Sequence, residues 1–155
     1  MSFLVTRPLL LAASLCSIGS AQTVTETYRL MPSVPPPSGS DVFGIRLEMD
    51  GDRAIVSDPG RAAVIFAVGS NTELLELDAQ GEPDDNFGAS VALSGDLAVV
   101  GARWEDSTAT GVDGDLGDNS SEDSGAAYIY RFQDATETWS LEDKLYPADV
   151  ASGDR

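Results

Sequence analysis

The sequence predicts an all-β chain built from repeated antiparallel sheets, and two observations support this prediction. First, apolar runs at 87–93 and 97–102 flank the turn Ser94-Gly95-Asp96, a pattern typical of a tight β-hairpin. Second, the same pattern stands 44 residues earlier, at 41–58. The coinciding pairs are Asp41/Asp85, Phe43/Phe87, Gly44/Gly88, Gly51/Gly95, Asp52/Asp96, Ala54/Ala98 and Val56/Val100. Self-similarity at a period of about 40–50 residues in a strand-rich sequence indicates a propeller-type array.

The repeated residues also carry a family resemblance. Phe43-Gly44 and Phe87-Gly88 open the two repeats, and Val100-Gly101-Ala102 closes the second hairpin. This arrangement resembles the FG-GAP repeat of integrin α-chain β-propellers, and the Ser-Gly-Asp turn is similar to that of secreted bacterial and environmental FG-GAP proteins. The resemblance covers nearly everything from Val24 onward. It implies a partial β-propeller with two four-stranded antiparallel blades and one N-terminal strand.

Residues 1–21 are predicted to be a signal peptide and not part of the fold. Arg7 supplies a short positive segment, an apolar stretch follows at 8–18, and small residues precede Gln22. The apolar stretch is too short to span a membrane. The single cysteine, Cys16, lies inside this segment, so we expect a mature chain without disulfides. We therefore expect a secreted or cell-surface protein, in a periplasmic or extracellular location.

The remaining elements follow in chain order. Residues 22–40 are expected to form an N-terminal strand, from the alternation at 24–30, and a proline-rich connector that cannot join a sheet. Blade 1 is expected at 41–86, with strands at 43–49, 53–57, 62–68 and 73–77. Blade 2 is expected at 87–155, with strands at 87–93, 96–102, 126–132 and 138–145, followed by the start of the next connector.

The last strand of blade 2 is expected to be an outer strand. Trp139, Leu141 and Leu145 are expected on one face of the strand, and Ser140, Glu142, Lys144 and Tyr146 on the other. Charge on an outer strand discourages edge-to-edge aggregation, which fits that position.

Two blades do not close a ring, because propellers have about four to eight. The chain also stops where the next Phe-Gly is due. We therefore expect an N-terminal fragment of a longer array, with further blades as partners. A natural two-blade protein that assembles in trans is the alternative.

Blade 2 is predicted to carry an acidic insertion at residues 105–123. Ala63 and Ile65 match Ala127 and Ile129 at a separation of 64 residues instead of 44, so 20 extra residues lie between the second and third strands. The insertion holds seven acidic residues and no basic ones.

Two interpretations of the insertion stand side by side. Calcium favours clustered carboxylates on a flexible, glycine-containing loop. The candidate ligands are Asp113, Asp115, Asp118 and Asp123. The second interpretation, which we favour, is a long solvated loop, the usual behaviour of such acidic segments. In the family, the calcium loop lies between the first two strands. This chain has only the turns Gly51-Asp52 and Gly95-Asp96 there, so the family's site is not implied.

The composition of the chain argues against several classes of function. With 26 acidic residues against 9 basic ones, binding to nucleic acid or to anionic lipid is not expected. The sequence contains no histidine, and without a mature cysteine the usual acid–base and nucleophile constellations are absent. We expect no enzyme and identify no catalytic or cofactor-binding residue.

The resemblance implies a secreted, non-enzymatic binding or adhesion module whose ligand is an extracellular protein or a carbohydrate. The alternatives are an accessory propeller part of a larger extracellular enzyme and a structural repeat of a cell-surface assembly. Phe43 and Phe87 are expected to pack between blades, and Trp104 is the one aromatic residue considered for ligand contact.

Overall fold

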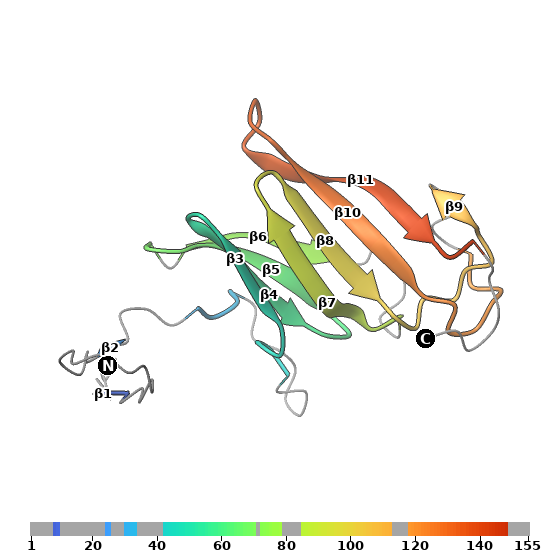
Figure 1. The fold of residues 1–155 in the computed structure, drawn as a ribbon, viewed down its shortest axis with the longest axis horizontal. Helices are drawn as coiled ribbons and strands as arrows, with labels where there is room; N and C mark the ends of the chain where they lie inside the picture. Colours follow the sequence, from blue (N-terminus) through green and yellow to red (C-terminus); the bar gives the residue numbers. More distant parts are fainter. Residues whose placement is uncertain are drawn as a thin grey trace, which may run out of the picture.

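Two stacked antiparallel sheets form the body of the protein (Figure 1). The computed structural model describes residues 8–9, 24–25, 30–33, 42–70, 72–78, 85–112 and 118–148. The first sheet has the order β3 (Leu47–Asp50), β4 (Arg53–Asp58), β5 (Ala62–Ala67) and β6 (Thr72–Asp78). The second has the order β7 (Phe87–Ser94), β8 (Leu97–Ala102), β10 (Ala126–Gln133), β11 (Thr138–Tyr146) and β9 (Gly111–Val112). The described residues contain strands and no α-helix, which confirms the all-β prediction with two consecutive blade-like sheets.

The strand pairings show that the two sheets are copies of one repeat. Leu47 pairs with Val56 in the first sheet, and Val91 pairs with Val100, 44 residues later, in the second. Both first hairpins close through two-residue turns, Gly51-Asp52 and Gly95-Asp96. Gly51 has φ 59° and Gly95 has φ 57°, a conformation that glycine adopts without strain. The predicted repeat and its tight hairpins are confirmed.

A β-bulge in the last hairpin corrects one prediction. Ile129 pairs with Asp143 while Tyr130 pairs with Leu141, so Glu142 is an extra residue in β11. The bulge reverses the alternation beyond it. Lys144 and Tyr146 therefore turn inward and are 1% and 7% exposed, whereas Leu145 is 36% exposed. The expectation that Lys144 and Tyr146 lie on the face opposite Trp139 is wrong for this reason.

The first sheet has the same irregularity. Ile65 pairs with Leu75 and Phe66 with Glu73, which leaves Leu74 as the extra residue. The bulge is therefore a property of the repeat.

The structure departs most from the predicted strands in two places. Strand β3 begins at Leu47 and not at Phe43, because residues 43–46 form turns. The second sheet has a fifth strand, since Gly111–Val112 of the acidic insertion pairs with Leu145 and Tyr146. Strand β11 is therefore covered at its C-terminal end by the insertion (Figure 1).

The main core lies between the two sheets. It contains Ile55, Ala63, Ile65 and Leu77 of the first sheet and Phe87, Leu93, Ala98, Val100, Ala102, Tyr128, Tyr130 and Trp139 of the second. Phe87 makes an edge-on contact with Tyr128, with ring centroids 5.1 Å apart. Its carbonyl accepts a hydrogen bond from Gly60 N at 2.9 Å, and Tyr130 Oη donates to Asp78 O at 2.7 Å. The packing role predicted for Phe87 is thus confirmed.

Gly88 explains why glycine follows this phenylalanine. It has φ 87°, and a Cβ atom there would lie 2.7 Å from the Ala62 carbonyl oxygen of the first sheet. The equivalent Gly44 has φ 91° but nothing within 4 Å of the corresponding position. The same backbone conformation thus faces a neighbour in one repeat and open space in the other.

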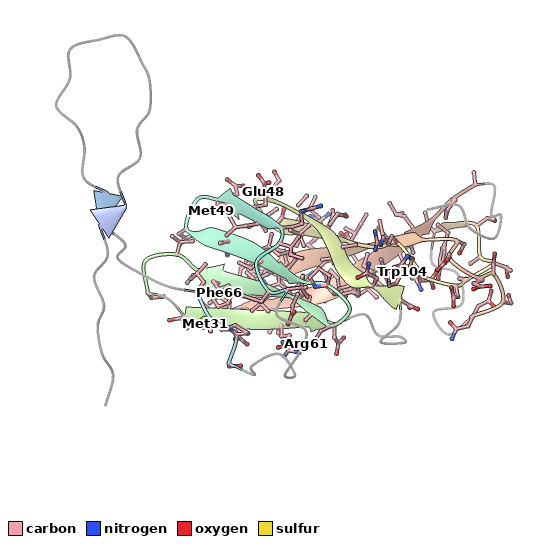
Figure 2. The ribbon with its side chains drawn as sticks, turned by 90° about the horizontal axis from the view of Figure 1, so that it is seen from below. Met31, Glu48, Met49, Arg61, Phe66 and Trp104 are labelled. Atoms are coloured by element: carbon pink, nitrogen blue, oxygen red, sulfur yellow. The ribbon has the colours of Figure 1, made fainter. Side chains whose placement is uncertain are left out.

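The outer face of the first sheet is equivalent, by the repeat, to the face of the second sheet that packs on the first. Phe43, Val56, Val64 and Phe66 form a smaller apolar cluster there, onto which Leu30 packs. At the edge of this sheet, however, Ile45, just before β3, and Leu47 and Met49 on β3 are 51%, 52% and 50% exposed, whereas Leu93, the equivalent of Met49, is 7% exposed. Figure 2 shows Met49 on β3 at the edge of this sheet.

The structure describes little of the region preceding the first sheet. Short strands β1 (Pro8–Leu9) and β2 (Val24–Thr25) pair antiparallel. The rest of the predicted signal peptide, and residues 26–29 of the predicted N-terminal strand, lie outside the described residues.

Candidate functional site

The acidic insertion leaves the second sheet at the end of β8 and returns at the start of β10. Its two legs are joined at their base by backbone bonds, from Ser121 N to Asp106 O at 2.6 Å and from Gly125 N to Glu105 O at 2.9 Å. Ser124 Oγ donates to the carbonyls of Glu105 and Ser107 at 3.0 and 2.6 Å. The base of the insertion is therefore an ordered continuation of the sheet.

A buried ion pair fixes this base to the body of the sheet. Lys144 Nζ donates to Glu105 Oε1, and both residues are 1% exposed. Glu105 Oε2 also accepts from Ser107 N at 3.1 Å. The ammonium lies 4.9 Å and 5.0 Å from the ring centroids of Tyr128 and Tyr146. The β11 bulge makes this possible, because it turns Lys144 inward.

The Glu105–Lys144 pair keeps the lysine charged although it is buried. Burial opposes the charged form of Lys144, but the hydrogen bond to Glu105 and the neighbouring negative charge outweigh it, so the pKa of Lys144 is raised. A buried charge needs such a partner, since removing one member of a buried pair is strongly destabilising. The insertion is thus attached to the core by a contact that is costly to break.

Asp118 holds the two legs of the insertion together further out. Its Oδ2 accepts from Thr108 N at 2.9 Å, Thr108 Oγ1 at 2.6 Å and Ser107 Oγ at 3.3 Å. Its Oδ1 accepts from the Ser120 Oγ at 2.6 Å and Ser120 N at 3.1 Å. The hydrogen bonds from the Ser120 and Thr108 hydroxyls and from the Thr108 amide lower the pKa of Asp118 well below its usual range. In this structure the carboxylate bridges the two legs of the loop.

The other candidate metal ligands are not brought together with Asp118 by any described contact. Asp123 N donates to Asp106 Oδ1 at 2.7 Å, and Asp123 has a positive φ of 58°. Asp113 and Asp115 lie outside the described residues. Among the residues that the structure does describe, no three His, Cys, Asp or Glu side chains are placed to hold a metal. Calcium binding by the insertion stays a prediction.

Trp104 lies at the end of β8, where the insertion begins (Figure 2). It is half-buried, and the Arg103 guanidinium carbon lies 4.5 Å from its ring centroid. A shallow hollow of about 450 Å³ nearby is lined by Arg103, Ser124 and Leu145 among others, but not by Trp104. A ligand contact for Trp104 stays a prediction.

Sequence reasoning missed a second region, a cavity between the hairpin ends of the two sheets. It has a volume of about 570 Å³ and is lined by Asp52, Arg53, Ala67, Leu74, Leu75, Phe132, Asp134, Glu137, Thr138 and Trp139. Its walls come from positions up to 87 residues apart, so no local motif marks it. The only local signal is the pair of acidic residues in the β10–β11 turn.

The comparisons with known proteins give one match. A family model for the FG-GAP repeat matches residues 77–130, which run from the end of β6 through most of β10. No curated protein and no solved structure matches the chain. Within the described residues, no helix is long and apolar enough to cross a membrane.

Proposed function

We propose that this chain, in which residues 77–130 match the FG-GAP repeat, is a secreted, non-enzymatic binding module that presents the acidic insertion as a recognition loop. FG-GAP repeats typically occur in extracellular proteins, which supports the location. The absence of histidine from the sequence supports the non-enzymatic role.

The observation that carries the proposal is the way the insertion is mounted. Its base is held by the buried Glu105–Lys144 pair and by Ser124, while Thr108 and Ser120 are exposed further out. A loop on a rigid scaffold loses less conformational entropy on binding than an unsupported loop. This arrangement is typical of recognition surfaces.

The exposed residues at the edge of the first sheet are evidence that further repeats pack there. Gly88 and the residues around it pack on the first sheet, whereas the equivalent Gly44 and the exposed Ile45, Leu47 and Met49 have no such neighbour. Exposed apolar residues gathered on β3 and the segment just before it mark an interface. We infer that a further copy of the repeat packs on this face.

Binding by the insertion is tested with the secreted protein and a variant in which residues 109–119 are replaced by a short Gly-Ser linker. The linker removes Asp113, Asp115 and Asp118 but leaves the base intact. Both proteins are passed over immobilised collagen, fibronectin, cellulose, chitin and alginate. We expect saturable binding to at least one of these by the natural protein and loss of that binding in the variant. The Tm of the variant should fall only slightly, because β9 and the Asp118 contacts are lost while the buried base is kept.

The non-enzymatic role is tested on the same probes. Each bound polymer is incubated overnight with the protein and then analysed by mass spectrometry, and we expect it unchanged. Cleavage of the polymer, or equal binding by both proteins, would contradict the proposal.

A further inference from the structure

The cavity at the hairpin ends of the two sheets has the features of a small-molecule site. Its volume of about 570 Å³ falls within the range of about 300–1,000 Å³ typical of ligand pockets. Its walls come from the β3–β4 turn and from β4, β5 and β6 of the first sheet, and from the β10–β11 hairpin of the second. Both sheets are described, so the cavity does not depend on a further repeat.

Arg53 supplies a cationic hydrogen-bond donor to this cavity. Its guanidinium carbon lies 4.1 Å from the ring centroid of Phe132 and 5.7 Å from that of Trp139. Its Nη1 donates only a long hydrogen bond to Gly95 O, at 3.4 Å. Among the described residues it forms no ion pair. Stacking fixes the plane of the guanidinium, and its remaining N–H groups are available to an acceptor.

Trp139 supplies a second donor beside the cavity. The residue is 8% exposed, and its Nε1–H has no hydrogen-bond acceptor among the described residues. Its indole lines this cavity and also a second one of about 360 Å³. Buried polar groups are nearly always hydrogen-bonded, so an orphaned indole N–H in a cavity wall points to an acceptor that is supplied from outside the chain.

The charges around the cavity restrict the class of ligand. Asp52, Asp134 and Glu137 line it from exposed turns, and Arg53 is its single basic residue. Three carboxylates would repel an anionic ligand, and the guanidinium of Arg53 would repel a cationic ligand. A neutral ligand with several hydroxyl groups donates to the carboxylates and accepts from Arg53, while its C–H face packs on the aromatic wall.

We propose that this cavity binds a neutral sugar, as one or two residues of an oligosaccharide. The inference goes beyond the proposed function, because it adds a second binding site to the same protein. It assigns the recognition of that ligand to the cavity and not to the acidic insertion.

The test uses tryptophan fluorescence, because Trp104 and Trp139 are the two tryptophans of the chain. In a Trp104→Phe background, the emission reports Trp139 alone. The probes are the neutral oligosaccharides cellohexaose, chitohexaose, maltohexaose, xylohexaose and mannohexaose. We expect at least one to shift the emission saturably, and we expect sodium chloride to leave the affinity unchanged because the ligand is neutral.

Two rim variants locate the binding. Asp134→Asn and Glu137→Gln each lose a charge-assisted hydrogen bond, so each should weaken binding about tenfold without changing the Tm. Glu48→Gln removes the same charge from an exposed position of β3 that does not line the cavity, and should leave the affinity unchanged. Both rim positions are exposed, so neither variant threatens folding.

The outcomes separate this inference from the proposed function. Sugar binding that is lost in the rim variants but kept in the linker variant supports the cavity. Sugar binding that is lost only in the linker variant overturns the cavity and leaves the recognition loop standing. A Trp139 emission that no probe shifts at about millimolar concentration overturns the inference, whatever the outcome of the polymer-binding experiment.

Discussion

Gly44 and Gly88 form a matched pair that measures the contact between the two repeats. Both have left-handed backbones, with φ 91° and 87°, so alanine at either position carries a similar strain of roughly 1–2 kcal/mol. At Gly88 the new Cβ would also lie 2.7 Å from the Ala62 carbonyl oxygen, whereas at Gly44 it meets nothing within 4 Å. Forcing the sheets apart adds about 1–3 kcal/mol at Gly88 alone.

The expected result is therefore an asymmetric loss of stability. Gly44→Ala should cost about 1–2 kcal/mol of unfolding free energy and Gly88→Ala about 2–5 kcal/mol. Urea unfolding followed by tryptophan fluorescence measures both costs. Since about 1 kcal/mol shifts the Tm of a small domain by about 4–8 °C, the two variants should also melt at clearly different temperatures. Equal costs in the two variants would refute the close approach of the repeats at Phe-Gly.

Three further predictions concern the acidic insertion and its base. Lys144→Met leaves the Glu105 carboxylate buried without its cation, so the unfolding free energy measured in urea should fall by about 3–5 kcal/mol. The control Arg131→Met breaks only exposed ion pairs and should lower the unfolding free energy by less than about 1 kcal/mol. Similar losses in the two variants would contradict the burial of the Glu105–Lys144 pair. The pKa of Asp118 in the folded protein lies below its unfolded value of about 3.8. The hydrogen bonds to its carboxylate therefore stabilise the loop fully at pH values above 3.8, and this stabilisation is lost as the pH falls toward the folded pKa. The NMR shift of the Thr108 amide should thus stay constant as the pH falls through 4, and a titration midpoint near 4 would exclude the network. Millimolar calcium should leave the Tm unchanged, since Asp118 already accepts five hydrogen bonds, and a calcium-dependent rise that the linker variant lacks would show that the insertion binds the ion.

The repeat made most of the fold predictable. The matches at a separation of 44 residues indicate that the first hairpins of the two repeats have the same pairing. The glycine in each turn indicates a two-residue turn. Leu47 and Val91 therefore take the pairing partners that the repeat predicts. The packing of Phe87 followed from the same pattern, because a repeat buries its face only against a neighbour.

The bulge limited what the alternation pattern could predict. One extra residue, Glu142, reverses the side of every residue that follows in β11, and nothing in the charged run around it marks the shift. The first repeat does carry a signal, because the adjacent Leu74 and Leu75 break the alternation at the equivalent bulge. The comparison places the bulge but not Lys144, because the equivalent residue is Glu76, whose side chain is 30% exposed.

The candidate site was less predictable because its contacts are long-range. Glu105 and Lys144 are 39 residues apart, and the sequence alone gives two charged residues without a reason to pair them. Arg53 and Phe132 likewise come from different repeats and meet only because the sheets stack. Composition identified the acidic insertion but not its ordered base.

Hydrogen exchange at the base of the insertion tests the proposed scaffolded loop most directly. The amides of Ser121, Asp123 and Gly125 donate to Asp106 and Glu105 at 2.6–2.9 Å, next to the buried ion pair. We predict that these amides exchange as slowly as those in the centre of β10, and that Lys144→Met accelerates their exchange. Exchange as fast as at the exposed Ala135 of the β10–β11 turn, in the natural protein, would contradict a rigid base and with it the recognition loop.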